Sequence, residues 1–231
     1  TTTALYSGVQ VTSYFLAGHE AAGQEALEAA LEALATFEEL FGPYRYRELD
    51  VAETATTAGG IEYPGLVVIH SGYYTPDNST LQAVIVHEVA HQWWYNLVGN
   101  DQVEEPWLDE ALTTYSTALF YEKTAGRDRA AGYMEWNRNR YQRMLEQGLD
   151  APVDRPVAAY SEAQYGPIVY AKGSLFFQAL REQVGDEAFG LILQTYYRRY
   201  LYGIATGEDF LAVAEEVSGQ DVHPLYREMI Q

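Results

Sequence analysis

The 231-residue sequence contains no cysteine, so disulfides, thiolate metal sites and a cysteine nucleophile are all excluded. Positive charge is scarce, because 14 lysines and arginines face 33 acidic residues and leave a net charge of −19. A surface this negative repels phosphate backbones and anionic lipids, so we expect neither nucleic acid nor a membrane surface as a partner. The longest aliphatic stretches, residues 66–69 and 83–86, fall far short of the about 20 residues that a membrane span requires.

The residues that are present are typical of one globular domain with an α+β fold. Apolar residues make up 48% of the chain, enough for a substantial core. Strand patterns gather in the first third, over residues 5–16, 44–53 and 61–70. Helical periodicity is found over residues 19–41, 79–97, 106–125, 128–147, 167–184, 186–201 and 207–218. We expect a single domain over residues 1–231, with an α/β part over about 1–98 and a helical part over about 99–231.

Two of the predicted helices begin with capping-box patterns. Ser79 and Gln82 have this spacing at the start of the helix over residues 79–97, and Thr206 and Asp209 have it at the start of a later helix. Gly219 is expected to end that later helix.

The sequence His87-Glu88-Val89-Ala90-His91 lies inside the helix predicted over residues 79–97. Two histidines four residues apart lean from one face of a helix and can share a metal ion, with Glu88 about 100° around the axis, beside the open metal position. This is the zincin arrangement. Histidine pairs at this spacing are also common as ordinary surface or core residues, so a third ligand is needed to decide.

Glu110 is the candidate for this third ligand. Catalytic zinc usually takes three protein ligands and keeps a fourth position for water, and two histidines with one glutamate are a standard set. Eighteen residues separate His91 from Glu110, which lies at the start of the next predicted helix, where the helix dipole alone also favours a carboxylate. The loop with Gly99 and Pro106 is long enough for that helix to fold back. The spacing therefore predicts one zinc ion held by His87, His91 and Glu110.

Three separate segments carry a family resemblance. They are HEVAHQWWYNLVGNDQVEEPWLDE, Gly59-Gly60-Ile61-Glu62-Tyr63 and Val169-Tyr170-Ala171-Lys172-Gly173. They resemble, respectively, the zinc-binding segment, the Gly-Ala-Met-Glu-Asn exopeptidase motif and the catalytic-tyrosine segment of the membrane alanyl aminopeptidase family of gluzincin metallopeptidases. The order and approximate spacing of the segments agree with that family, so the resemblance implies a thermolysin-like catalytic domain.

The resemblance implies zinc-dependent hydrolysis of peptide bonds, by an aminopeptidase whose substrates are peptides with a free N-terminus. Glu88 would be the general base, and Tyr170 would stabilise the oxyanion. Glu62 matches the glutamate that binds the substrate's α-ammonium group. Gly59 and Gly60 would let the backbone approach the substrate and pair with it as an added strand.

Departures from the family pattern concern substrate fit, since the predicted metal ligands and Glu88 are retained. The replaced family residues are methionine at Ile61, asparagine at Tyr63, asparagine at Asp109 and glycine at Ala111. The family usually has a β-rich domain before this one and helical domains after it, and neither fits in 231 residues. We therefore expect an excised catalytic domain whose partners include flanking domains of the full-length chain.

Two other functions stay open at this point. Tyr63 and the changes around Glu62 leave room for an endopeptidase or a tripeptide-releasing peptidase of the same fold. The missing flanking domains leave room for a zinc-binding domain that is catalytically silent without them.

Residues that support the metal site are less clearly marked. A metal-bound imidazole usually donates its other N–H to an oxygen, and the candidates near Glu110 in the sequence are Asp109, Thr113 and Thr114. The remaining histidines show no ligand spacing, and we expect structural roles for His19, His70 and His223.

Overall fold

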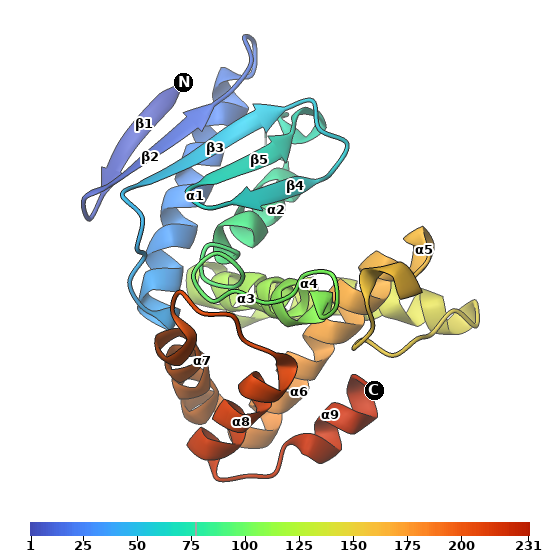
Figure 1. Ribbon diagram of the computed structural model, residues 1–231. Helices are drawn as coiled ribbons and strands as arrows, with labels where there is room; N and C mark the ends of the chain where they lie inside the picture. The colour runs from blue at the N-terminus through green and yellow to red at the C-terminus, as the bar shows by residue number, and fades with distance from the viewer. Residues whose placement is uncertain (77) are drawn as a thin grey trace. The chain divides into compact units, whose positions relative to one another are not determined.

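A computed structural model of the chain describes residues 1–76 and 78–231. The chain divides into two compact units, Thr1–Asn96 and Leu97–Gln231, which run from blue to green and from green to red in Figure 1. Among the described residues, no helix combines the length and the hydrophobicity needed to cross a bilayer.

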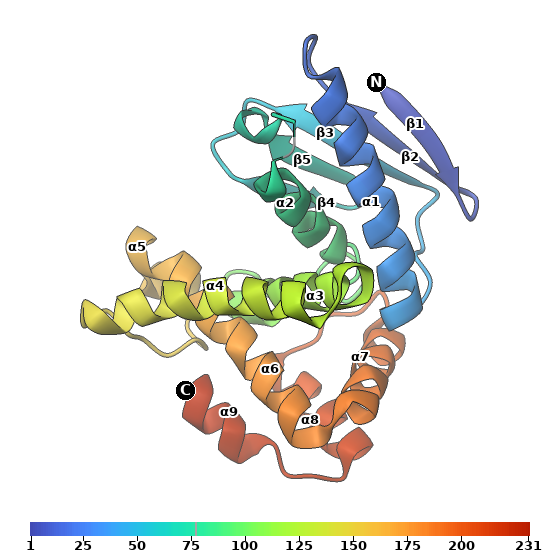
Figure 2. The same ribbon diagram turned by 180° about the vertical axis from the view of Figure 1, so that it is seen from behind.

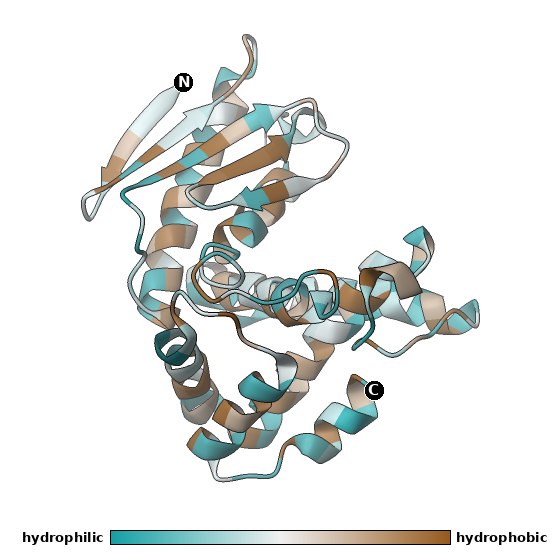
Figure 3. Cartoon of the chain, in the orientation of Figure 1, coloured by the Kyte–Doolittle hydropathy of each residue, from teal (hydrophilic) through white to brown (hydrophobic). Residues whose placement is uncertain are grey.

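The described part of the first unit is built on a five-stranded sheet with the order β1-β2-β3-β5-β4. The strands are β1 (Thr2–Tyr6), β2 (Val9–Tyr14), β3 (Glu48–Thr54), β4 (Gly60–Tyr63) and β5 (Leu66–His70). β3 pairs in parallel with β2 and β5, whereas the edge strands β1 and β4 pair antiparallel with β2 and β5. Figure 3 shows β5 as a largely hydrophobic strand, and its residues Val67 and Ile69 are fully buried.

Two helices cover one face of this sheet, as Figure 2 shows from behind. α1 (Glu20–Phe41) packs against β1, β2 and β3, and α2 (Ser79–Ala90) packs against β4 and β5. The apolar stripe predicted for the first helix is confirmed, because Ala26, Ala30, Leu34 and Phe37 are all buried. This packing places α2, which contains the candidate metal ligand His87 and is followed directly by His91, against β4 and β5.

Trp93 and Trp94 follow α2 and pack onto the end of α1. Their rings lie 6.2 and 4.7 Å from that of Phe41. The Trp93 indole N–H donates to the Gly42 carbonyl over 2.8 Å. The segment after α2 is therefore anchored to the core of the first unit.

The expectation of single strands over residues 5–16 and 61–70 is wrong, because each segment folds as a hairpin. The first hairpin turns at Ser7-Gly8 and the second at Pro64-Gly65. Gly8 and Gly65 have φ values of 88° and 72°, a region that glycine enters readily because it lacks a Cβ. Both turns carry a signal in the sequence, but the apolar pattern continues across them.

The helix predicted over residues 79–97 also differs in the structure. It ends at Ala90, and its N-cap is Asn78, whose side chain accepts a hydrogen bond from the Thr80 N–H over 3.0 Å. The predicted capping box of Ser79 and Gln82 is therefore wrong, because Asn78 takes the capping position.

The second unit is mainly helical. Its helices are α3 (Pro106–Ala125), α4 (Arg127–Glu146), α5 (Glu162–Tyr165), α6 (Gly173–Val184), α7 (Asp186–Tyr200), α8 (Gly207–Ser218) and α9 (His223–Met229). A 3-10 turn, η2 (Val157–Ala159), lies before α5, and a π-helical segment, η3 (Gly166–Lys172), leads into α6. α3 is central, because it packs against α4, α6 and η3.

The ends of α8 follow the predicted pattern. The capping box of Thr206 and Asp209 is present, and Gly219, with φ 68°, ends the helix. The strands of the described residues all lie in the first unit, so the predicted α+β class is confirmed.

Candidate active site

His87, on the last turn of α2, and His91, the C-cap of that helix, lie one turn apart, and their Nε2 atoms are 3.2 Å apart. Two nitrogens bound to one zinc ion at about 2.0–2.1 Å with a tetrahedral angle would lie about 3.3 Å apart. The observed spacing therefore fits a shared metal ion without rearrangement of either ring.

The ring of His91 is oriented by the backbone that follows it. Its Nδ1 lies 3.0 Å from the Trp94 carbonyl oxygen, so Nδ1 carries the proton and Nε2 keeps its lone pair for a metal. The chain turns back at Tyr95, whose φ is 105°, and the Asn96 N–H donates to the His91 carbonyl over 3.1 Å. This partner was missed by the sequence reasoning, because a backbone carbonyl has no signature in side-chain patterns.

Glu88 is buried, with 6% of its surface exposed, and its carboxylate lies against β4. A Cβ placed on Gly60 would overlap this carboxylate, so the glycine leaves the space that Glu88 occupies. Glu62 lies two residues further along β4 and is half-buried, and Gly59 immediately precedes the strand. The first unit therefore places the histidine pair and Glu88 on α2 beside the glycines and Glu62.

Glu110 and Tyr170 come together in the second unit although they lie 60 positions apart in the sequence. The Tyr170 hydroxyl, on η3, donates to Glu110 Oε1 over 2.5 Å, the length of a charge-assisted hydrogen bond. The Tyr170 ring packs edge-on against Tyr165, with 5.8 Å between centroids. Burial lowers the pKa of the Arg140 guanidinium, which interacts electrostatically with Tyr170.

Asp109 anchors the start of α3 beside Glu110. It is 1% exposed and accepts hydrogen bonds from Asn100 Nδ2 at 3.0 Å and Gln102 Nε2 at 2.9 Å. A carboxylate can accept both donors at once, which gives a physical reason for aspartate at this position. These hydrogen bonds join the first turn of α3, which carries Glu110, to the preceding loop.

The sequence profile described as "Peptidase family M1 domain" matches residues 25–229. The chain belongs to peptidase family M1. Aminopeptidase M1-B of Oryza sativa subsp. japonica is 32% identical, in an alignment that covers 94% of this M1 chain and 26% of the relative. The chain thus spans about a quarter of the length of the curated relatives that it matches first.

The fold of the M1 chain is similar to that of two solved structures. Yeast LTA4 hydrolase has a TM-score of 0.79 and 19% identity, over 97% of this chain and 38% of that one. The M1 zinc metallopeptidase from Deinococcus radiodurans has a TM-score of 0.74 and 20% identity, over 100% and 50%. These likenesses support the fold expected for a gluzincin catalytic domain.

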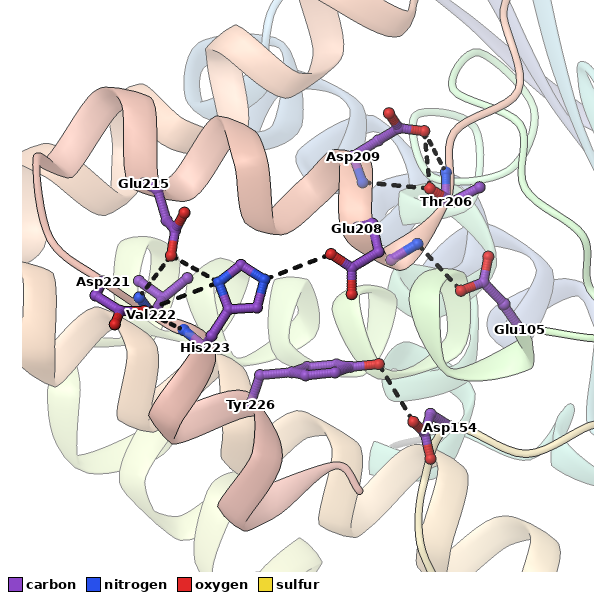
Figure 4. Close-up of polar contacts among 11 residues, drawn as sticks. Glu105, Asp154, Thr206, Glu208, Asp209, Glu215, Asp221, Val222, His223 and Tyr226 are labelled. Carbon is purple, nitrogen blue, oxygen red and sulfur yellow. Dashed lines mark hydrogen bonds and ion pairs between the residues drawn. The ribbon is translucent and has the colours of Figure 1, made fainter.

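The M1 chain has a second histidine and carboxylate cluster in its helical unit, shown in Figure 4. His223 Nδ1 lies 2.7 Å from Glu215 Oε1 and 3.8 Å from Asp221 Oδ1, and its Nε2 lies 3.4 Å from Glu208 Oε2. Hydrogen bonding with Glu215 raises the pKa of His223 and lowers the pKa of Glu215. The imidazole therefore links α8 to α9 through these carboxylates, and the contacts become ion pairs when the ring is protonated.

The other two histidines outside the zincin motif also have partners in the M1 chain. His19 Nδ1 lies 2.7 Å from the buried Glu53 carboxylate, and His70 Nδ1 lies 2.6 Å from the Thr56 carbonyl. These contacts fit the structural roles expected from the sequence.

Proposed function

We propose that residues 1–231 form one catalytic domain of a zinc-dependent aminopeptidase, with an α/β part over about 1–98 and a helical part over about 99–231. Membership of peptidase family M1 supports the peptidase class. The names of the matched relatives, which are aminopeptidases, support the exopeptidase type. Flanking domains of a longer chain belong to the proposal as partners, since the relatives are about four times as long as the match.

Zinc would be held by His87, His91 and Glu110. The donor set fits the ion, because it offers two imidazole nitrogens and one carboxylate. When bound, zinc would supply Lewis-acid activation of a water molecule and of the scissile carbonyl. The observation that carries this proposal is the 3.2 Å separation of the two Nε2 atoms, with the tautomer of His91 set by the Trp94 carbonyl.

Glu88 would take a proton from the attacking water and pass it to the leaving amine. The burial of its carboxylate against Gly60 supports this role, because the absence of a side chain on the glycine leaves the space that the carboxylate occupies beside β4. Tyr170 would donate its hydroxyl to the oxyanion that forms on the substrate. In the structure the same hydroxyl donates to Glu110.

Glu62 would bind the α-ammonium group of the substrate, and this contact would restrict the enzyme to free N-termini. Gly59 and Gly60 would let the substrate backbone approach β4. The position of β4 at the edge of the sheet supports this role, because an edge strand can accept another strand.

The test combines metal content with hydrolysis of aminoacyl arylamides. We expect about one zinc ion per chain, a loss of zinc in His87→Ala, and retained zinc in Glu88→Gln with a loss of about 100- to 10,000-fold in kcat. A Glu88→Gln protein that still hydrolyses substrate at the unmodified rate would rule out Glu88 as the base.

A second comparison separates the competing functions. A peptide with a free N-terminus and its N-acetylated form are offered to the unmodified chain. Cleavage of the free form alone with release of single residues supports an aminopeptidase, and release of tripeptides supports a tripeptide-releasing peptidase. Equal cleavage of both forms supports an endopeptidase. Bound zinc without cleavage of either form supports a domain that needs its flanking partners.

A further inference from the structure

β4 carries the proposed amine-binding residue, and its connection to β5 is short. The turn consists of Pro64 and Gly65, and the φ of 72° at Gly65 after a proline matches a type II turn. Two-residue hairpins prefer types I′ and II′, because those turns match the twist of the paired strands. The turn itself therefore favours the pairing of β4 with β5 less than a type I′ or II′ turn would.

Gln92 forms hydrogen bonds with this hairpin from outside it. Its side chain is completely buried, its Oε1 accepts from the Gly65 N–H over 2.8 Å, and its Nε2 donates to the Tyr63 carbonyl over 3.0 Å. Because one partner can only donate and the other can only accept, the orientation of the amide is determined. The Gln92 amide group thus forms hydrogen bonds with backbone groups on both sides of Pro64.

Asn96 adds a third bond to the same strand end. Its Nδ2 donates to the Glu62 carbonyl over 3.2 Å, while its own N–H donates to the His91 carbonyl over 3.1 Å. Gln92 directly follows His91 in the chain. Three side-chain hydrogen bonds, two to the end of β4 and one to the turn after it, therefore join this hairpin to the segment that directly follows His91.

We propose that Gln92, assisted by Asn96, is a positioning residue that sets the place of β4 relative to the metal-binding helix, and with it the requirement for a free substrate amine. This inference rests on the proposed aminopeptidase function. The Glu62 carboxylate must meet the α-ammonium group while the scissile carbonyl reaches the reacting groups on α2. A displacement of about 1 Å in such an arrangement can cost about 100-fold in rate.

The test uses Gln92→Leu, which keeps the approximate size of the side chain and removes both hydrogen bonds. Gln82→Leu is the matched control, because it makes the same change on α2 at a residue that does not contact the turn. Three quantities are measured: amide hydrogen exchange at Gly65, zinc affinity by competition with a chelator, and kcat/KM for a peptide and its N-acetylated form.

We expect Gln92→Leu to speed exchange of the Gly65 amide by about tenfold or more. The preference for the free amine should fall by about 10- to 100-fold, mainly through a higher KM, while zinc affinity stays within about twofold. Gln82→Leu should change none of these quantities. If Gln92→Leu does not fold, Asn96→Asp removes one donor at nearly constant size and should give a smaller loss of the same kind.

Each other outcome counts against the proposal. Faster Gly65 exchange with an unchanged amine preference would show that Gln92 is merely structural, and a parallel loss of zinc affinity would show that the metal site itself is disturbed. If the unmodified chain cleaves the acetylated peptide equally well, the aminopeptidase function fails. The rate of amide exchange at Gly65 in Gln92→Leu then shows separately whether the hydrogen bonds of Gln92 hold the turn.

Discussion

Tyr170→Phe distinguishes two tasks of a single hydroxyl group. The hydroxyl donates to Glu110 over 2.5 Å, and the ring packs against Tyr165 at 5.8 Å. Phenylalanine keeps the ring and its packing and removes only the oxygen. The effect of the hydroxyl on zinc affinity and its effect on kcat can therefore be measured separately.

The size of each effect follows from the geometry. Loss of a hydrogen bond to a charged group costs about 1.5 to 3 kcal/mol, which corresponds to about 10- to 150-fold in zinc affinity if the hydroxyl holds Glu110 for the ion. Groups that orient metal ligands usually contribute about 10- to 100-fold. If the hydroxyl also serves the oxyanion, kcat falls by about 100- to 1,000-fold even when zinc is saturating.

The assay measures zinc affinity by competition with a chromophoric chelator and kcat for an aminoacyl arylamide at excess zinc. We expect Tyr170→Phe to lose about tenfold in zinc affinity and at least about 100-fold in kcat. The reason for the loss in kcat is that the Tyr170 hydroxyl would donate to the oxyanion instead of to Glu110 during the reaction. Tyr165→Phe is the control, since it removes a hydroxyl from the neighbouring ring. A Tyr170→Phe protein with unchanged affinity and unchanged kcat would refute both roles.

Three further predictions concern stability. Because φ is 105° at Tyr95, the Tyr95→Gly protein should be more stable to urea unfolding than the Tyr95→Ala protein by about 1 to 2 kcal/mol, since only glycine avoids the backbone strain. A Tyr95→Ala protein of equal or greater stability would refute strain at this position. Because hydrogen bonding raises the pKa of His223, its imidazolium stabilises the fold fully below about pH 6.5, and this contribution is lost as the pH rises through the raised pKa. His223→Gln should therefore lower the unfolding free energy by about 0.2 to 1 kcal/mol at pH 6 and by less at pH 9, and a loss that grows with pH would contradict this sign. Arg181 donates to both carboxylate oxygens of Glu122, at 2.6 and 3.1 Å, so Arg181→Met should lower the free energy of unfolding by about 1 to 2 kcal/mol. A double-mutant cycle with Glu122→Gln measures the coupling between the two side chains, and a coupling of zero would argue against this ion pair.

The features that sequence patterns predicted correctly are those set by neighbours in the chain. α1 has 22 residues, so its apolar stripe repeats over several turns and stands out from chance. The capping box of Thr206 and Asp209 involves only four consecutive positions. The spacing of His87 and His91 follows from the pitch of one helix, so the pairing of their imidazoles could be expected from the amino-acid sequence alone.

The end of α2 and the contacts of Gln92 were missed because they depend on tertiary contacts. Apolar residues continue through Trp93 and Trp94, which is why the pattern extends the helix to residue 97. In the structure α2 stops at Ala90, because these indoles pack onto the end of α1 and Tyr95 takes a positive φ. Packing of this kind overrides local helix propensity. Likewise, the bonds of Gln92 to the hairpin turn have no sequence signature, since their partners are backbone atoms.

The supports of the candidate metal ligands lie within the unit that carries each ligand. His91 is oriented by the Trp94 carbonyl in the first unit, and Glu110 is held by Tyr170 in the second. A ligand that is already oriented loses little conformational freedom when a metal binds, so more of the binding energy appears as affinity. Under the proposed function, removal of either support should therefore weaken zinc binding without a change in the number of ligands. Because both ligands would hold the same ion under this proposal, the two losses should couple rather than add.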